Sequence, residues 1–192
     1  MGRIYYIMGK SATGKDTIYK EVLKRRPDLK TIVMYTTRPI REGETEGVEY
    51  HFRTIPEREA MRDSGKIIEL RMYQTVFGPW YYFTMDDGQF DLASETNYLM
   101  IGTLESYEKM RQYFGQESLV PIYIEVPDGI RLQRAVDRES AQKNPNYKET
   151  CRRYLADEDD FTEEVLERLN IVKRYQNINL EECLAAVLDD IG

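Results

Sequence analysis

The stretch Gly9–Thr17, GKSATGKDT, constrains the fold of this 192-residue chain more than any other feature. It follows a short apolar run at residues 4–8 and precedes a helical pattern at residues 18–23. A Gly-x4-Gly-Lys spacing between a strand and a helix is typical of a loop that binds phosphate. Glycines let the backbone wrap around an anion, and successive N–H groups and the helix N-terminus then point at it. We therefore predict that the chain binds a nucleotide or another polyphosphate.

The end of this loop differs from the usual pattern. Lys15 is expected to reach the β- and γ-phosphates as a point charge. The usual Ser or Thr after the lysine is Asp16 here, and Thr17 comes one place later. A carboxylate at this place can bind Mg²⁺ or repel the β-phosphate, and both readings stay open. Asp16 and Thr17 are the candidate metal ligands. The predicted ATP-binding loop residues are Gly9, Lys10, Ser11, Ala12, Thr13, Gly14, Lys15, Asp16 and Thr17.

Composition limits the class of protein. The net charge of −7 argues against a general nucleic-acid binder. The apolar stretches are strand-sized, so we expect no membrane span, and the N-terminus lacks the pattern of a signal peptide. Cys151 and Cys183 are far apart and form no metal-ligand spacing, so we expect a reduced pair and a cytoplasmic protein. His51 is the only histidine and cannot form a zinc site alone.

Strand-like and helical patterns alternate along most of the chain. This alternation predicts an α/β fold with a parallel sheet covered by helices on both faces. Residues 36–96 break the rhythm and predict an inserted mixed α+β lobe. Residues 139–146 predict a mobile loop, and the acidic run 157–160 predicts a solvated helix face. The expected core strands are 3–8, 31–35, 97–102 and 119–126. The expected helices are 16–26, 103–114, 128–138 and 180–191, and a long helical region is expected over about 147–169.

A second motif lies between a strand end and a turn. Arg38 and Arg41 stand three apart, so they can hold one phosphate from two sides, and Tyr50 offers a hydroxyl donor. The alternative is that these arginines lie on a surface loop without such a role.

The two motifs together resemble the guanylate kinase family. The resemblance is most specific over residues 36–52, where the pattern is Thr-Thr-Arg-x-x-Arg-x-Gly-Glu-x-x-Gly-x-x-Tyr-x-Phe. It implies a P-loop NTPase-type sheet core, a monophosphate-binding lobe and a helical lid. The expected parts of this single domain are a core of residues 1–35, 97–138 and 165–192, a lobe of 36–96 and a lid of 139–164. The implied activity transfers the γ-phosphate of ATP to GMP or dGMP with Mg²⁺, in a monomer or homodimer that needs neither nucleic acid nor membrane.

The resemblance also implies roles for individual residues. Arg38, Arg41, Tyr50 and Tyr82 would hold the phosphate of GMP, and Tyr35 stands where the family has a small serine beside it. Glu69 would read the N1 and N2 donors of guanine, because a carboxylate offers two acceptors, and Thr84 would contact the base. Asn177 would lie near the adenine of ATP. The residues that would meet the transferring phosphoryl group are Lys15, Arg134, Arg138 and Arg153.

Departures from the family keep three functions open. The strand end at residues 99–103 lacks acidic residues that the family has there, and the segment 71–80 is longer than its counterpart. That segment either forms the rim of the base pocket or simply packs Trp80 on the surface. The chain is an ATP:GMP phosphotransferase, a kinase of the same fold with another phosphorylated acceptor, or a non-catalytic module that binds a phosphopeptide or partner. Gly9, Gly14 and Lys15 disfavour the third, and Glu69 favours the first over the second.

Overall fold

A five-stranded parallel sheet forms the core of the computed structural model, which describes residues 1–75 and 77–192. The order is β2-β7-β1-β8-β9, and every pair in it is parallel. The central strand is buried at all five positions, as a strand covered on both faces should be. The predicted α/β class is therefore confirmed. The strands are β1 (Ile4–Met8), β2 (Lys30–Thr31), β7 (Tyr98–Ile101), β8 (Leu119–Glu125) and β9 (Arg174–Gln176).

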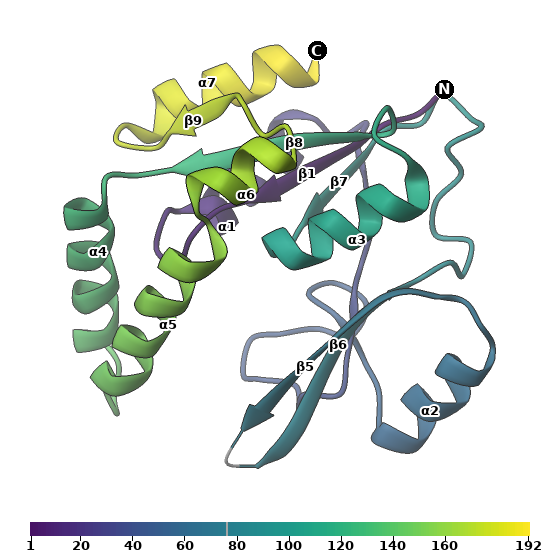
Figure 1. The fold of residues 1–192 in the computed structure, drawn as a ribbon, viewed down its shortest axis with the longest axis horizontal. Helices are drawn as coiled ribbons and strands as arrows, with labels where there is room; N and C mark the ends of the chain where they lie inside the picture. The colour runs from purple at the N-terminus through teal and green to yellow at the C-terminus, as the bar shows by residue number, and fades with distance from the viewer. Residues whose placement is uncertain (76) are drawn as a thin grey trace.

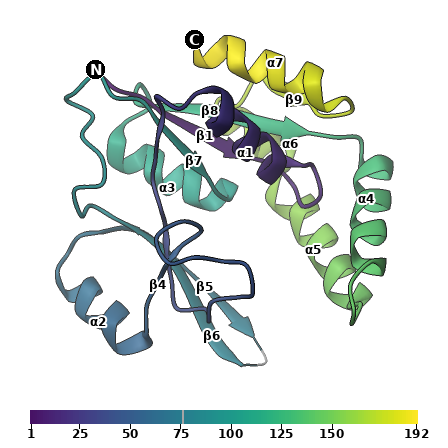
Figure 2. The ribbon, with the colours of Figure 1, turned by 180° about the vertical axis from the view of Figure 1, so that it is seen from behind.

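Helices cover both faces of this sheet (Figures 1 and 2). On one face, α1 (Lys15–Arg25) and α7 (Leu180–Ile191) pack apolar side chains against β1 and β8. On the other face lie α3 (Leu104–Phe114) and α6 (Glu163–Arg168). Side-chain caps fix where α3 and α7 begin: Thr103 accepts from the Ser106 N–H, and Asn179 accepts from the N–H groups of residues 181 and 182.

A second sheet forms the lobe below the core. Its order is β4-β3-β6-β5, and the helix α2 (Ile55–Asp63) covers one side of it. The strands are β3 (Tyr35–Thr36), β4 (His51–Phe52), β5 (Ile67–Thr75) and β6 (Gly78–Met85). The prediction of one strand over residues 31–35 is wrong: its first residue pairs in the core sheet and its last in the lobe sheet. An apolar run shows that both ends are buried, but not that they pair with different sheets.

The helix α4 (Asp128–Ser140) follows β8, and α5 (Tyr147–Asp160) comes next along the chain and lies beside α4 (Figure 1). The helical region predicted over residues 147–169 consists of two helices, α5 and α6. Phe161 turns into the core and stacks on Tyr123, with ring centroids 5.6 Å apart, and the Thr162 hydroxyl starts α6 by accepting from the Val165 N–H. Sequence reasoning also missed β9, which is short and largely polar.

Two further points concern the whole described chain. No helix within residues 1–75 and 77–192 is long and apolar enough to cross a membrane. Cys151 is exposed and Cys183 is buried, and both are free thiols. Val76, in the predicted rim segment 71–80, lies outside the described residues; Trp80 stacks on Phe77 with ring centroids 6.2 Å apart.

Candidate active site

The loop between β1 and α1 has the shape that an anion site requires. Gly14 has φ 84°, a left-handed conformation that favours glycine. A Cβ there would also lie 2.5 Å from the Asn177 amide nitrogen, so the backbone conformation and the available space both exclude a larger residue. The same nitrogen of Asn177 donates to the Thr13 carbonyl at 2.8 Å. Asn177 thus holds the loop in place from the segment after β9. The helix α1 begins at Lys15, and no side chain of the described residues caps its first turn.

The charged end of the loop offers oxygen ligands beside an ammonium group. The Lys15 Nζ lies 3.5 Å from Asp16 Oδ2, and the Asp16 side chain is 78% exposed. Thr17 is exposed on the same turn. A carboxylate and a hydroxyl suit Mg²⁺, which takes few protein ligands and completes its shell with phosphate oxygens and water. No group of three or more His, Cys, Asp or Glu side chains able to hold a metal occurs in the described parts of the chain. The oxygens of Asp16 and Thr17 fit an ion that takes most of its other ligands from a nucleotide and water.

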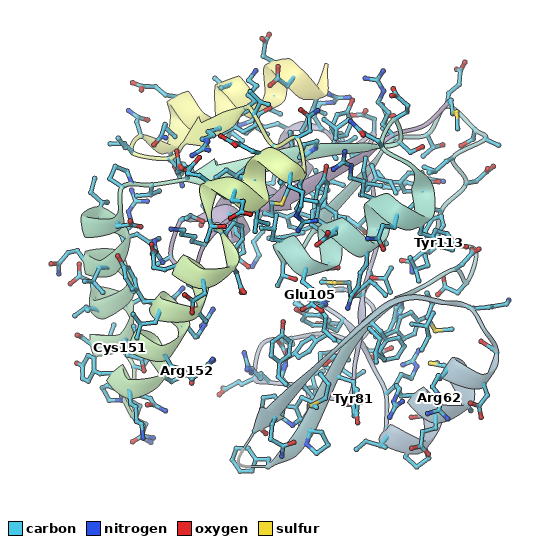
Figure 3. The ribbon with its side chains drawn as sticks, viewed as in Figure 1. Arg62, Tyr81, Glu105, Tyr113, Cys151 and Arg152 are labelled. Carbon is cyan, nitrogen blue, oxygen red and sulfur yellow. The ribbon has the colours of Figure 1, made fainter. Side chains whose placement is uncertain are left out.

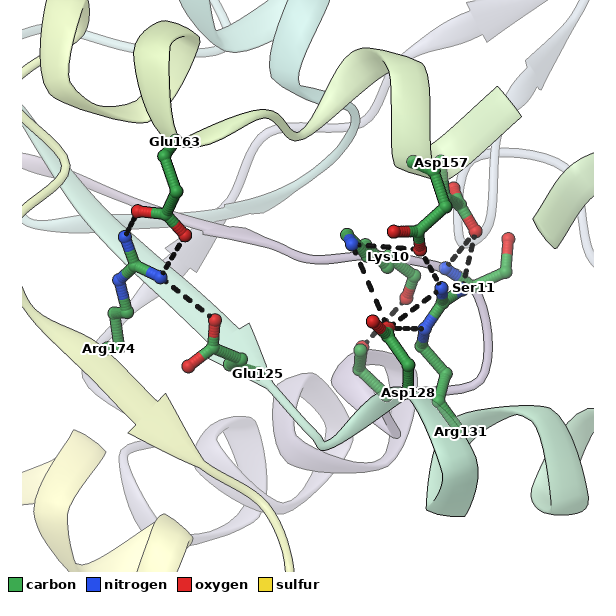
Figure 4. A network of polar contacts seen from close by, with 10 residues as sticks. Lys10, Ser11, Glu125, Asp128, Arg131, Asp157, Glu163 and Arg174 are labelled. Atoms are coloured by element: carbon green, nitrogen blue, oxygen red, sulfur yellow. Dashed lines mark hydrogen bonds and ion pairs between the residues drawn. The ribbon is translucent and has the colours of Figure 1, made fainter. Parts of the chain in front are cut away.

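Two carboxylates of the acidic run 157–160 lie against this loop, which corrects the prediction of a solvated face for that half of the run (Figure 4); Asp159 and Asp160 are exposed as predicted. Asp157 Oδ2 accepts from the backbone N–H of Ser11 at 2.8 Å. Glu158 accepts from Lys10 Nζ at 2.9 Å. An acidic run on a helix indicates exposure unless a partner is known. Here the partners come from a loop 146 and 148 residues earlier in the chain, so the pattern of α5 alone could not show them.

Arg131 joins the loop, α4 and α5. Its side chain is 1% exposed, and it contacts Asp128 at 3.1 Å, Asp157 at 3.2 Å and Glu158. The guanidinium also lies 4.0 Å from the centre of the Tyr154 ring. A buried guanidinium needs carboxylate partners, and three surround it here. Sequence reasoning missed Arg131; its only signal was an arginine one turn before Arg134.

A cavity of about 230 Å³ lies beside the loop, next to Lys10 and Thr13. Glu125, Asp128 and Glu163 contribute three carboxylates to its lining, and Figure 4 shows Arg174 between Glu125 and Glu163. Because carboxylates repel phosphate, this cavity does not suit a polyphosphate. The backbone N–H groups of the loop suit a phosphate, whereas the carboxylate-lined cavity beside the loop does not.

Two of the three arginines predicted to meet the transferring phosphoryl group lie next to the loop. Arg138 of α4 and Arg153 of α5 line a narrow hollow together with Ser11. Arg134 instead donates to the carbonyl of Asn177 at 3.0 Å. The neighbouring Arg152 lies on the exposed part of α5 (Figure 3), where its guanidinium forms a two-bond fork on Glu149 at 2.8 and 2.7 Å. The structure thus brings Arg153, and not Arg152, to the loop.

A second cationic group lies in the lobe. Arg38 is only 3% exposed and donates two hydrogen bonds to Glu44, at 2.9 and 2.8 Å. Its guanidinium lies 5.4 Å from the centre of the Tyr50 ring. The rings of Tyr50 and Tyr82 are 5.7 Å apart. Burial raises the pKa of Tyr50 above its ordinary value, so its hydroxyl is a neutral donor at neutral pH. Arg41 is exposed on the same turn, and its backbone N–H donates to Glu44 at 2.8 Å.

Glu69 and Thr84 lie together on the lobe sheet, on the face that also holds Tyr82. The Thr84 hydroxyl donates to Glu69 Oε1 at 2.9 Å, and both side chains are buried. Arg71, two residues along β5, donates to both oxygens of the same carboxylate. Sequence reasoning missed Arg71, although the two-residue period of a strand places it on the same face as Glu69.

The structure does not bring Tyr35 to this group. Tyr35 stacks on Phe83 with ring centroids 5.2 Å apart, and its hydroxyl donates to Asp87. These contacts place it in the small core under α2, on the opposite face of the lobe sheet from Tyr82 and Thr84. Because successive side chains of β3 point to opposite faces of the sheet, Tyr35 points into this small core. It is therefore not part of the candidate site.

Comparisons with known proteins agree with this geometry. A family profile described as "Guanylate kinase" matches residues 1–84. The guanylate kinase of Salinibacter ruber is 32% identical over 145 residues, which cover 72% of this chain and 75% of that protein. The chain belongs to the guanylate kinase family. It is accordingly a phosphotransferase that binds ATP and acts on a nucleoside monophosphate. The profile match includes the phosphate-binding loop and the lobe arginines, and ends before Arg134, Arg138 and Arg153.

Two further relatives extend the guanylate kinase likeness over nearly the whole chain. The guanylate kinase of Chlorobium chlorochromatii is 29% identical over 195 residues, covering 99% of this chain and 92% of that protein. The crystal structure of guanylate kinase from Anaplasma phagocytophilum matches with a TM-score of 0.67 at 19% identity, covering 99% of this chain and 84% of that one. That structural likeness shows a shared fold.

Proposed function

We propose that this member of the guanylate kinase family transfers the γ-phosphate of ATP to GMP or dGMP, giving ADP and the diphosphate. The observation that supports it is the presence of two separate cationic groups in one chain. One is the loop at Gly9–Thr17 in the core, and the other is Arg38 with Tyr50 and Tyr82 in the lobe. Burial is the main cause of the raised pKa of Tyr50, and the negative charge of Asp16 adds to it.

The donor half would hold ATP along the loop. Its backbone N–H groups and Lys15 face the phosphates, and Asp16 and Thr17 would hold a Mg²⁺ ion that supplies further positive charge. Phosphoryl transfer depends mainly on positioning and on neutralising the charge of the moving group. Arg138 and Arg153 would supply that charge from α4 and α5. Arg134 and Asn177, joined by a hydrogen bond, would lie on the adenine side.

The acceptor half would hold the monophosphate in the lobe. Arg38 and Arg41 give paired N–H donors for the phosphate, and the hydroxyls of Tyr50 and Tyr82 add neutral donors. The base would extend toward Thr84 and Glu69, because a carboxylate is the acceptor that the N1–H and N2–H donors of guanine require.

The test is a panel assay with the full chain, ATP and Mg²⁺. The acceptors are GMP, dGMP, AMP, CMP and UMP, and ADP formation is measured. We expect turnover with GMP and dGMP. Turnover confined to a different acceptor would leave the same-fold kinase as the function. ATP binding without turnover of any acceptor would leave the non-catalytic module.

A further inference from the structure

The carboxylate of Glu69 is already engaged inside the lobe. Its side chain is fully buried, and that of Arg71 is 4% exposed. Arg71 Nε donates to Glu69 Oε2 at 2.9 Å, and Arg71 Nη2 donates to Glu69 Oε1 at 3.2 Å. The Thr84 hydroxyl donates to Oε1 as well, at 2.9 Å. Of the roughly four acceptor positions of a carboxylate, three are therefore filled.

Arg71 forms the kind of contact that guanine would need. The two parallel N–H groups of a guanidinium bind both oxygens along one edge of a carboxylate. Guanine presents the same arrangement, because N1–H and the 2-amino N–H are parallel donors on one guanidine-like unit. Two such forks cannot occupy one edge at the same time. The position left on Glu69 Oε2, outside the fork, accepts one donor and not two.

Arg71 is also held from the core side. Its Nη1 donates to the Thr103 hydroxyl at 3.0 Å, at the start of α3, and its Nη2 lies 3.4 Å from Met34 Sδ. Turning the guanidinium away from Glu69 would give up a buried ion pair together with these contacts. A base that needs the whole edge of Glu69 must therefore displace a well-anchored side chain.

We propose that Arg71 is a specificity-determining residue of the acceptor site. It competes with guanine for Glu69, so the enzyme distinguishes only weakly between GMP and a purine monophosphate that lacks the 2-amino group. This inference rests on the proposed function, because it presumes that a purine monophosphate is the acceptor. Arg71 acts through Glu69 and is a positioning residue, not a catalytic one.

The experiment compares GMP with IMP, which differ only in the 2-amino group. For the wild-type chain we expect kcat/KM for GMP to exceed that for IMP by less than about tenfold. In Arg71→Met the edge of Glu69 becomes available, and the ratio should rise by roughly tenfold or more, as for a gained hydrogen bond to a charged group. Equilibrium binding of GMP and IMP in the presence of ADP should give the same change without turnover.

Matched variants separate this effect from damage to the fold. Glu69→Gln combined with Arg71→Met removes both charges together, and its ratio should return to the wild-type level. Arg62→Met, at an exposed position of α2, should leave the ratio unchanged. Should Arg71→Met fold poorly, Glu69→Gln alone decides: the ratio stays near the wild-type value if Arg71 holds the carboxylate, and collapses if Glu69 reads guanine freely.

The outcomes distinguish the two proposals. A wild-type ratio of a hundredfold or more that Arg71→Met does not increase would overturn the role of Arg71 while leaving the kinase activity in place. A wild-type chain that phosphorylates neither monophosphate, with ATP bound, would overturn the proposed function itself.

Discussion

In both halves of the candidate site, carboxylates pair with the groups that would bind phosphate. These carboxylates come from a distant helix in the donor half and from neighbouring residues in the acceptor half. At the phosphate-binding loop the partners Asp157 and Glu158 belong to α5, a different element far along the chain. In the lobe the partners are local: Glu44 follows Arg38 by six residues, and Glu69 precedes Arg71 by two.

This difference implies two ways of making room for substrate. The carboxylates on α5 leave the loop together if the helix moves as a body, because they share one rigid element. The lobe pairs travel with the lobe, so no motion of the lobe separates them. A ligand must compete for each cation there by local exchange of hydrogen bonds. We therefore expect the donor half to respond to changes in α5 and the acceptor half to respond to changes at single side chains.

The largest expected effect is at Lys15. Lys15→Ala should lower kcat by roughly a thousandfold or more, because the charge facing the transferring phosphate is lost. The fold should persist, since the Lys15 side chain is partly exposed and its ion pair is with the exposed Asp16. Steady-state assays and thermal melting measure both effects, with Lys20→Ala at an exposed position of α1 as the control. Wild-type turnover in Lys15→Ala would show that the loop is not the donor site.

Arg41 tests the acceptor half alone. Arg41→Ala should raise the KM for the monophosphate by roughly tenfold or more and leave the KM for ATP unchanged, because one charged donor to the acceptor phosphate is removed. The side chain is exposed, so folding should not suffer. Initial rates at varied GMP and varied ATP give the two constants, and Arg62→Ala serves as the control. An effect confined to ATP would contradict the division into two halves.

Asp157 tests the carboxylate supplied by α5. Asp157→Ala should lower the KM for ATP by up to roughly tenfold, because the Ser11 N–H no longer has a competing acceptor. Arg131 keeps Asp128 and Glu158 as partners, which limits the loss of stability. Asp159→Ala, an exposed neighbour on the same helix, is the control. A higher KM for ATP in Asp157→Ala would mean that the carboxylate supports the loop rather than blocking it.

The smallest expected effect is the pH dependence of the local pair at Glu44. The hydrogen bond from Arg38 holds the pKa of Glu44 below its ordinary value of 4.5. A depressed carboxyl pKa stabilises the folded state above the unfolded pKa, and this stabilisation is lost as the pH falls through the folded pKa. Glu44→Gln should lower Tm by about 3 °C at pH 7, as about 1 kcal/mol does in a domain of this size, and the difference should vanish at strongly acidic pH.

Thermal melting from pH 7 downward measures this difference, with Glu42→Gln on the same turn as the control. A difference in Tm that stays constant through the acidic range would show that the charge of Glu44 contributes nothing.

Features that depend on neighbouring residues were the ones the sequence could predict. The loop and the place of Arg38 and Arg41 after a strand end both follow from short spacings. The split between β2 and β3 and the break at Phe161 did not, because both depend on which distant surface buries an apolar residue.

The candidate site follows the same division. The contacts of Arg131 and the α5 carboxylates join segments far apart, so no local pattern could reveal them. Arg71 is different: the strand period alone places it beside Glu69, and the fork between them could have been predicted from residues 69–71.

The way the lobe is inserted has a consequence for how the chain folds. The lobe leaves the core after β2 and returns at β7, and these strands are direct neighbours, with Lys30 paired to Tyr98 and Thr31 to Leu99. Forming that pair closes one long loop, and the entropy cost of closure grows only with the logarithm of loop length, about 0.6 kcal/mol for each doubling. Residues can therefore be added to or removed from the lobe's exposed turns at little cost to the core sheet, which leaves the acceptor pocket free to change size while the donor loop stays as it is.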